Sequence, residues 1–305
     1  MLRHLTIPRG PIELAADLHL PDDIAGAAAP LPTVVLSTPG SSVKEQIGAN
    51  YASRLASRGL AAITFDPAHQ GASGGDRRDL EDPYQRSEDI SFVIDALAGI
   101  PEADESRVGA LGICAGGGYA VYTARTDHRI RALGTVVAGN MGTSWRAMQQ
   151  SGAIGDLDTL AGDRLEENRT GDLHRLNWLP DTLEDAAAVG ATDIDTTQAI
   201  TFYRTERGRH ERSTNRRLTR SDSLLLGFDA FHLVDPLLTQ PLQVIVGGRR
   251  GNTRQFEAGM ELLKLAPNPV DLMVVAGAGH YDMYDVPEYV DAAVDRLVRF
   301  YGEYL

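Results

Sequence analysis

Cysteine and lysine are almost absent from this chain of 305 residues. Cys114 is the single cysteine, so the chain can form no internal disulfide and no cysteine-rich metal site. Lys44 and Lys264 are its only lysines, and arginine supplies nearly all of the positive charge. We expect neither a metal nor a cofactor from this composition. The unpaired thiol of Cys114 remains free to react.

The chain also lacks long apolar runs and an excess of positive charge. No run approaches the length of a membrane span, and the first residues lack the apolar core of a signal peptide, so we expect a cytoplasmic protein. The net charge of −13 argues against nucleic acid or an anionic membrane as a partner, because both need a cationic surface. We therefore expect a small-molecule substrate. A carrier protein that delivers this substrate and a second copy of the chain both remain candidate partners.

Buried strands and amphipathic helices alternate along most of the sequence. Apolar patterns predict an edge hairpin over 4–7 and 12–20, core strands over 33–37, 61–65, 108–113, 132–138, 243–246 and 270–275, and helices over 44–57, 254–265 and 287–304. This alternation predicts a parallel sheet covered by helices on both faces. Residues 144–231 show helical stretches without a strand pattern. We therefore predict an α/β core over 1–142 and 236–305, with a helical cap inserted over 143–235.

The most informative stretch is residues 107–119, where a short apolar run leads into a cluster of glycines. Gly-Ile-Cys-Ala-Gly at 112–116 matches the nucleophile elbow between a strand and a helix, with cysteine in the place of serine. The turn is so sharp that the residues two places before and after the nucleophile must lack a Cβ, as Gly112 and Gly116 do. Cys114 would then lie at the positive end of a helix, which favours its thiolate.

Two simpler interpretations of this stretch are a phosphate-binding glycine loop and an inert core cysteine. A dinucleotide-binding loop needs Gly-x-Gly-x-x-Gly near the start of the fold. Here Gly112, Ile113 and Cys114 break that order, and the stretch comes a third of the way along the chain. The pattern therefore favours the elbow, which would turn the Cys114 side chain out of the sheet.

Further motifs follow the order of a known superfamily. A strand followed by an oxyanion-type loop at 38–42, the elbow at Cys114, and Gly-x-Gly-His ending at His280 together resemble the α/β-hydrolase superfamily. Segments 42–46, 66–74, 80–83, 88–90, 111–119 and 280–285 more narrowly resemble the YcjY-type hydrolases, a group that includes fungal polyketide transferases and lies close to dienelactone hydrolases. The resemblance implies an α/β-hydrolase fold, with an eight-stranded, mostly parallel sheet, helices on both faces and an inserted helical cap. It also implies that Asp66 is structural.

Cys114 is the candidate nucleophile, and His280 is the candidate base that takes the thiol proton. The superfamily usually places an aspartate after the strand over 243–246, but residues 247–253 contain no acid. Asn140 could fix the tautomer of His280, as asparagine does in Cys-His-Asn sites, or could merely close a turn between its neighbouring glycines. Asp282 is a further option, although it lies only two residues from His280.

The remaining candidates concern the oxyanion and the substrate. The backbone N–H of Ala115 and a second N–H from Gly40 or Ser41 would stabilise an oxyanion. Trp145 and Trp178 could line an apolar pocket above the thiol or anchor the cap to the core.

Three charged or titratable features also have two interpretations each. His69 could contact substrate or only shape its loop. The arginines of residues 204–220 could form a solvated face or a docking patch for the phosphopantetheine arm of an acidic carrier protein. Lys44 and Glu45 are expected to form a surface ion pair at the start of a helix.

These residues predict acyl transfer through Cys114 and His280. The enzyme would be a hydrolase or acyltransferase, such as an esterase or thioesterase, that acts on an ester, lactone or thioester. One alternative is a lyase or cyclase that acts on a polyketide-like substrate in the same pocket. Another is a degenerate hydrolase that only binds a ligand or a partner protein.

Overall fold

An eight-stranded sheet forms the core of the molecule, with strand order β1-β2-β4-β3-β5-β6-β9-β10. The computed structural model describes residues 1–23, 30–148 and 153–305. The strands of the sheet are β1 (Leu2–Arg9), β2 (Ile12–His19), β3 (Leu31–Ser37), β4 (Ala61–Phe65), β5 (Ala103–Ile113), β6 (Ile130–Val136), β9 (Leu242–Gly247) and β10 (Pro269–Val275). β2 pairs antiparallel with β1 and β4, and the other neighbours pair parallel. The predicted edge hairpin and the eight-stranded, mostly parallel sheet are thus confirmed.

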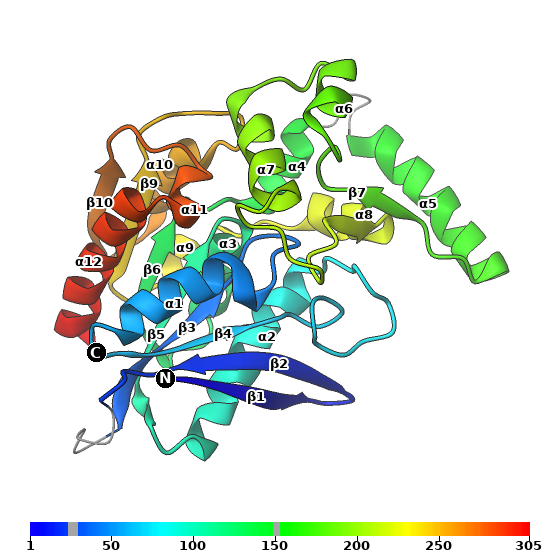
Figure 1. Cartoon of the computed structure of the whole chain (residues 1–305). Helices are drawn as coiled ribbons and strands as arrows, with labels where there is room; N and C mark the ends of the chain where they lie inside the picture. The colour runs from blue at the N-terminus through cyan, green and yellow to red at the C-terminus, as the bar shows by residue number, and fades with distance from the viewer. Residues whose placement is uncertain (24–29, 149–152) are drawn as a thin grey trace.

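Helices cover both faces of this sheet (Figure 1). The helices of the core are α1 (Ala49–Ala56), α2 (Pro83–Asp95), α3 (Ala115–Ala124), α10 (Gln255–Leu265), α11 (Asp282–Asp285) and α12 (Pro287–Tyr304), with η2 (Lys44–Gly48) before α1 and η3 (Ala96–Gly99) after α2. α1 and α12 pack on one face, and α2, α3 and α10 pack on the other. On β3, Val34 and Leu36 contact the first set of helices and Val35 contacts the second. This alternation explains why Val34, Val35 and Leu36 are apolar at successive positions.

The segment between β6 and β9 lies beside the carboxyl ends of the strands and is called the cap segment here (residues 143–235; Figure 1). It and its borders contain α4 (Met141–Met148), α5 (Ala153–Thr170), β7 (Arg175–Asn177), α6 (Leu183–Ala188), α7 (Ile194–Arg204), β8 (Arg216–Leu218), α8 (Arg220–Gly227) and α9 (Val234–Leu237). The prediction of helices alone is wrong in one respect, because β7 and β8 form an antiparallel pair. These strands have three residues each and consist mainly of arginine, leucine and asparagine, so they carry no alternating apolar pattern.

Within the described residues, no helix combines the length and the apolar character that crossing a membrane requires.

Candidate active site

Cys114 occupies the corner between β5 and α3 in a strained backbone conformation. Its φ of 57° and ψ of −124° lie in a region that non-glycine residues rarely adopt. An added Cβ at Gly112 would lie 2.5 Å from the carbonyl oxygen of Gly116, and one at Gly116 would lie 2.1 Å from that of Ser37. Both glycines are therefore required by sterics, as the sequence predicts. The corner is held by the N–H of Cys114, which donates to the carbonyl of Val136 at 3.1 Å.

The thiol of Cys114 is surrounded by protein on most sides but is not fully buried. Burial raises its pKa, and hydrogen bonds from the Tyr284 hydroxyl and the Ala115 N–H oppose this effect without cancelling it. The pKa of Cys114 is therefore above its usual value, and the thiol is protonated near neutral pH. The expected thiolate at the helix start is not the resting state, because the cost of burying charge exceeds the gain from one helix N–H.

The hydroxyl of Tyr284 connects the thiol with His280. It hydrogen bonds to the sulfur of Cys114 and lies 3.2 Å from Nε2 of His280. No hydrogen bond joins Cys114 and His280 directly in the described part of the chain. The His280 ring is 2 % exposed, and burial lowers its pKa to about 4, so the ring is neutral and can accept a proton. Tyr284 was missed by the sequence analysis, although it lies in the motif over 280–285 and one helical turn after His280.

Three tyrosines line this side of the site. Tyr281 and Tyr284 follow His280, and their rings lie 4.9 Å apart between centroids. Tyr203 comes from α7, and its hydroxyl hydrogen bonds with Ser42 and Tyr284. Burial raises the pKa of all three hydroxyls, so they stay protonated and can donate hydrogen bonds. The cap segment thus contributes directly to the walls of the site.

The loop after β3 presents two backbone N–H groups near the elbow. The N–H groups of Gly40 and Ser41 make no hydrogen bond to any other described residue, and Ser41 has a φ of 63°. Arg86 on α2 is buried and donates to the carbonyl oxygens of Thr38 at 2.6 Å and Pro39 at 3.4 Å. This arrangement is compatible with the predicted oxyanion role of Gly40, Ser41 and Ala115.

Asn140 does not orient His280 in this structure. Its Nδ2 donates to Asp229 at 2.7 Å, and its Oδ1 accepts from the N–H groups of Ala230 at 3.2 Å and Thr143 at 3.5 Å. The contacts with Asp229 and Ala230 tie the start of α4 to the loop after α8, and the contact with Thr143 closes a local turn, so the prediction of Asn140 as a triad member is wrong. The neighbouring glycines leave the turn open for this contact, which a local pattern cannot reveal.

Asp282 is also bonded elsewhere. Its carboxylate accepts from Gln198 at 2.9 Å and from the N–H of Gly279 at 2.8 Å, and it forms an ion pair with Arg249. Nδ1 of His280 is buried and has no hydrogen-bond partner among the described residues. Neither Asn140 nor Asp282 therefore binds Nδ1 of His280 in this structure.

The two tryptophans take different positions. Trp178 lies over the oxyanion loop, where its Cη2 is 3.6 Å from the position of an added Cβ at Gly40. Trp145 packs edge-on against Trp178 at 5.5 Å between centroids, and Arg217 stacks on both rings. Trp178 therefore packs on the oxyanion loop and Trp145 packs on Trp178, and a contact of either ring with substrate stays a prediction.

The contacts of His69 lie mainly within its own loop. An added Cβ at Gly75 would lie 2.3 Å from its Nδ1, and its backbone N–H donates to the carbonyl of Gly74 at 2.8 Å. Burial and then the nearby Arg9 lower the pKa of His69, while Gln85 hydrogen bonds to it. The structure thus places His69 among residues of its own loop, β1 and α2, which fits the interpretation that it shapes the loop, and its contact with substrate stays a prediction.

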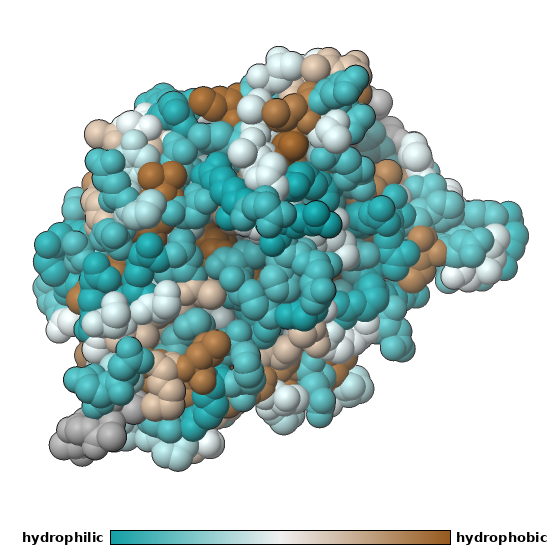
Figure 2. Space-filling view, viewed as in Figure 1, coloured by the Kyte–Doolittle hydropathy of each residue, from teal (hydrophilic) through white to brown (hydrophobic). Residues whose placement is uncertain are grey.

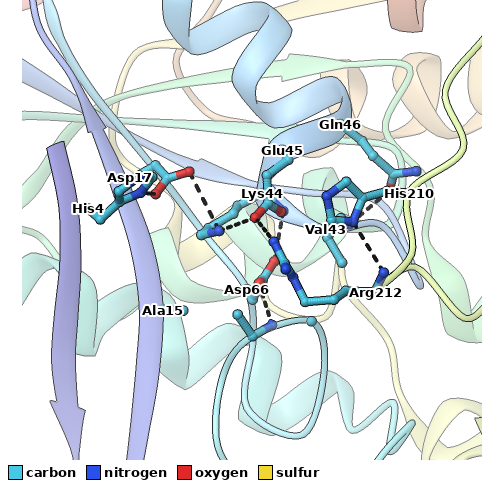
Figure 3. A network of polar contacts seen from close by, with 12 residues as sticks. His4, Ala15, Asp17, Val43, Lys44, Glu45, Gln46, Asp66, His210 and Arg212 are labelled. Carbon is cyan, nitrogen blue, oxygen red and sulfur yellow. Dashed lines mark hydrogen bonds and ion pairs between the residues drawn. The ribbon is translucent and has the colours of Figure 1, made fainter. Parts of the chain in front are cut away.

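A network of charged residues links the cap segment to the start of η2 (Figure 3). Lys44 is only 5 % exposed and pairs with Glu45 and with Asp17, the latter at 3.6 Å. Arg212 of the cap segment also pairs with Glu45. The predicted surface pair of Lys44 and Glu45 is therefore a largely buried one. Asp66 is fully buried and accepts from the backbone N–H groups of Lys44 and Ala72, each at 2.7 Å, which confirms its structural role.

A recess of about 320 Å³ opens beside the tyrosines. Its lining consists of Asp181, Tyr203, Arg204, Arg209, His210, Glu211 and Ser213. Ser213 also donates to the carbonyl of Ser41 at 2.8 Å, so the recess borders the oxyanion loop. Its walls are mostly polar, unlike the predicted aromatic pocket. Figure 2 likewise shows a mainly hydrophilic face with apolar residues in separate small patches. No described group of three or more histidine, cysteine, aspartate or glutamate side chains is placed to hold a metal.

Comparisons with known proteins agree with this geometry. The family model for X-Pro dipeptidyl-peptidase (S15 family) matches residues 10–226. The uncharacterized protein YcjY of Escherichia coli (strain K12) is 36 % identical over 273 residues, which cover 89 % of this chain and 88 % of YcjY. The crystal structure of the hypothetical protein PA2218 from Pseudomonas aeruginosa has a TM-score of 0.87 and 27 % identity, covering 100 % of this chain and 94 % of that one. The crystal structure of the α/β hydrolase GrgF from Penicillium sp. sh18 has a TM-score of 0.80 and 17 % identity, covering 100 % and 99 %.

The family match spans strands β2 to β6, the elbow and most of the cap segment, and the structural matches extend over the whole chain. The similarity to YcjY confirms the resemblance that the motifs indicate, and the likeness to GrgF confirms the fold. We conclude that this chain belongs to the X-Pro dipeptidyl-peptidase (S15) family of the α/β-hydrolase superfamily.

Proposed function

We propose that this protein is an acyl-transfer enzyme in which Cys114 forms a thioester with the acyl group of an ester, lactone or thioester substrate. The observation that carries the proposal is the arrangement at the elbow. The thiol of Cys114 hydrogen bonds with the Tyr284 hydroxyl, its sulfur accepts from the Ala115 N–H, and the same hydroxyl lies within reach of Nε2 of a neutral His280. A nucleophile, a proton acceptor and free backbone donors therefore meet at one point.

The first step needs a base because the thiol is protonated. In this mechanism the sulfur attacks the carbonyl carbon, its proton passes to the Tyr284 oxygen, and the hydroxyl proton of Tyr284 passes to Nε2 of His280. The two transfers are concerted, because the strongly raised pKa of Tyr284 makes a free tyrosinate inaccessible. The substrate oxygen becomes an oxyanion that accepts from Ala115 and from Gly40 or Ser41.

The second half of the reaction reverses the proton flow. Collapse of the tetrahedral intermediate breaks the bond to the leaving alcohol or thiol, which takes the proton back from His280, and Cys114 is left as a thioester. Water or an alcohol then attacks the thioester carbon, and its proton moves to His280. The product leaves as an acid or a new ester, and the thiol of Cys114 is restored.

The name of one relative supports this chemistry. GrgF is named a polyketide transferase, and it is 26 % identical over 129 residues that cover 42 % of this chain. Transfer of a polyketide-like acyl group to an alcohol is therefore the form of the reaction that we favour. The polar recess beside Tyr203 suits an oxygen-rich acyl chain better than a plain fatty acyl chain.

Trapping the acyl-enzyme tests the proposal. We expect p-nitrophenyl acetate to add one acetyl group to Cys114, detected by intact and peptide mass spectrometry, and to release nitrophenol in a burst. Cys114→Ala should lose the adduct and at least about a thousandfold in rate. Iodoacetamide should block the adduct in the native protein.

An intact fold without any acetyl adduct at Cys114 would contradict the proposal and would favour a hydrolase-fold binding protein. A lyase or cyclase would instead convert substrate without a burst and without an adduct. Circular dichroism of Cys114→Ala should match that of the unchanged protein, which separates lost chemistry from lost structure.

A further inference from the structure

His280 has one ring nitrogen for which the proposed mechanism provides no partner. Nε2 faces Tyr284, whereas Nδ1 is buried and makes no hydrogen bond with any described residue. An unpaired buried polar atom is costly, and a histidine base needs an acceptor at Nδ1 to hold its proton there and keep Nε2 free. Asn140 and Asp282 bind other groups.

The cap segment places a buried carboxylate beside the loop that carries His280 (residues 277–285, the histidine loop). Asp195, in the first turn of α7, is 2 % exposed. Its Oδ2 accepts from the N–H and the Oγ1 of Thr253, each at 2.8 Å, whereas its Oδ1 accepts no hydrogen bond within the described chain. An added Cβ at Gly251 would lie 2.2 Å from that Oδ2, so the loop leaves room for the carboxylate only because residue 251 is glycine.

Two sets of contacts bring Asp195 and His280 to the same wall. One turn after Asp195, Gln198 donates to Asp282 at 2.9 Å, which places this side of α7 against the histidine loop. The loop between β9 and α10 holds Asp195 through Thr253. The same loop binds the histidine loop, because the N–H groups of Gly248 and Arg249 donate to the carbonyls of Val275 and Ala278, each at 2.9 Å.

The charges around the ring agree with this placement. Burial lowers the pKa of His280, and Asp195 is the charged group that raises it. Among the described residues, the other titratable groups in contact with the ring or with Tyr284 include Tyr281, Tyr203 and Cys114, and these and Tyr284 itself are neutral when protonated. Asp282 and Arg249 pair with each other, so their charges largely offset.

We infer that Asp195 is the positioning carboxylate of this site, which accepts the Nδ1–H of His280 and thereby keeps Nε2 as the base. The inference deepens the proposed function and rests on it. Hydrogen bonds of this kind are often long in ligand-free enzymes and tighten when substrate binds. Because α7 belongs to the cap segment, the base is fully set only when the cap segment is docked on the core.

The test compares two neighbouring aspartates. Asp195→Asn keeps the shape of the side chain and an acceptor for Thr253 but removes the charge. Asp193→Asn is the matched control, because Asp193 caps α7 by accepting from Thr196 at 3.0 Å and asparagine caps helices equally well. We expect the pKa of His280, followed by NMR titration of its ring, to fall further in Asp195→Asn and to stay unchanged in Asp193→Asn.

Steady-state kinetics provide a second test of the role of Asp195. The kcat for p-nitrophenyl acetate should fall about a hundredfold in Asp195→Asn with little change in KM, and the acidic limb of its pH profile should move to lower pH. A purely structural role would lower the rate without moving that limb. Asp193→Asn should retain the rate of the unchanged protein.

The outcomes separate the two hypotheses. A His280 titration that Asp195→Asn leaves unchanged would overturn this inference even if the rate falls. The titration needs no turnover, so it decides the role of Asp195 even if no acetyl adduct forms and the proposed function fails. If Asp195→Asn does not fold, the unchanged protein still decides: a downfield Nδ1–H resonance of His280 supports the pair, and an Nε2–H tautomer overturns it.

Discussion

The elbow and the histidine loop (residues 277–285) face each other across the site but are held in different ways. The backbone of Cys114 hydrogen bonds with Val136, Gly117 and Gly139, all of which belong to the core. The histidine loop instead depends on side chains of the cap segment. Gln198 donates to Asp282 at 2.9 Å, and Arg207 donates to Asp285 and to the carbonyl of Tyr281 at 3.0 Å. The nucleophile is therefore set by core backbone, whereas the base is set by the cap.

The arginines of residues 204–220 explain much of this attachment. Ion pairs join Arg207 to Asp285 and Arg212 to Glu45 of the core, whereas Arg204 pairs with Asp181 and Arg217 with Asp222 within the cap segment. Charges that are already paired attract an acidic partner less strongly than free ones do. The interpretation as a docking patch for a carrier protein thus remains a prediction, and the structure favours a role in fastening the cap segment to the core.

Disrupting the elbow, which belongs to the core, should have the largest effect. Gly116→Ala adds a Cβ that would meet the carbonyl of Ser37 at 2.1 Å, so we expect a loss of about 3 kcal/mol or more in unfolding free energy. Urea denaturation followed by circular dichroism measures it. Gly162→Ala is the matched control, because an added Cβ on α5 meets nothing within 4 Å. That variant should gain about 0.5–1 kcal/mol from reduced chain entropy and helix propensity.

Removing the Tyr284 hydroxyl, which lies between the nucleophile and the base, should have the second largest effect. Tyr284→Phe removes the hydroxyl that joins Cys114 to His280 and should lower kcat about a hundredfold. Tyr301→Phe is the control, because the buried hydroxyl of Tyr301 on α12 donates to the carbonyl of Ala110 on β5 at 2.6 Å and contacts neither Cys114 nor His280 among its hydrogen bonds. It should lose about 1 kcal/mol of stability and no activity. Equal rates in the Tyr284→Phe variant and the unchanged protein would show that Cys114 and His280 meet without the bridge.

Acid should weaken the histidine side selectively. Burial lowers the pKa of His280 from 6.5 to about 4, so the unfolded chain binds a proton at a higher pH than the folded protein does. Stability from this group is complete above pH 6.5 and falls as the pH drops toward 4. Between pH 7.5 and 4.5 the unchanged protein should lose about 2 kcal/mol more than His280→Gln, measured by urea unfolding at both pH values. Equal losses would mean that His280 titrates normally in the folded state.

Loosening the cap should have the smallest effect. Arg207→Gln removes the two hydrogen bonds to Asp285, and we expect kcat to fall about tenfold because the base is less well placed. Its control, Arg169→Gln, breaks an exposed ion pair with Glu166 on α5 and should change neither rate nor stability measurably. Alkylation of Cys114 by iodoacetamide should proceed at the same rate in both variants, because the elbow does not depend on the cap contacts.

Much of the fold is determined by short stretches of sequence. The apolar runs of β3, β5 and β9 predict a sheet buried on both faces, because side chains on both faces of each strand pack against helices. The elbow follows from Gly112 and Gly116, whose spacing only a sharp strand-to-helix turn requires. His280 is indicated by the Gly-x-Gly-His pattern. Each of these features depends on neighbours within a few residues, so the sequence alone predicts it.

Only the tertiary structure decided which side chains meet His280 and which do not. Asn140 is bonded to Asp229, Lys44 is buried beside Asp17, and Tyr284 bridges the nucleophile and the base. The carboxylate that we assign to His280 comes from Asp195, 85 residues earlier (280 − 195) in the sequence. No local periodicity encodes such contacts, because they join segments whose approach depends on how the cap segment packs against the finished sheet.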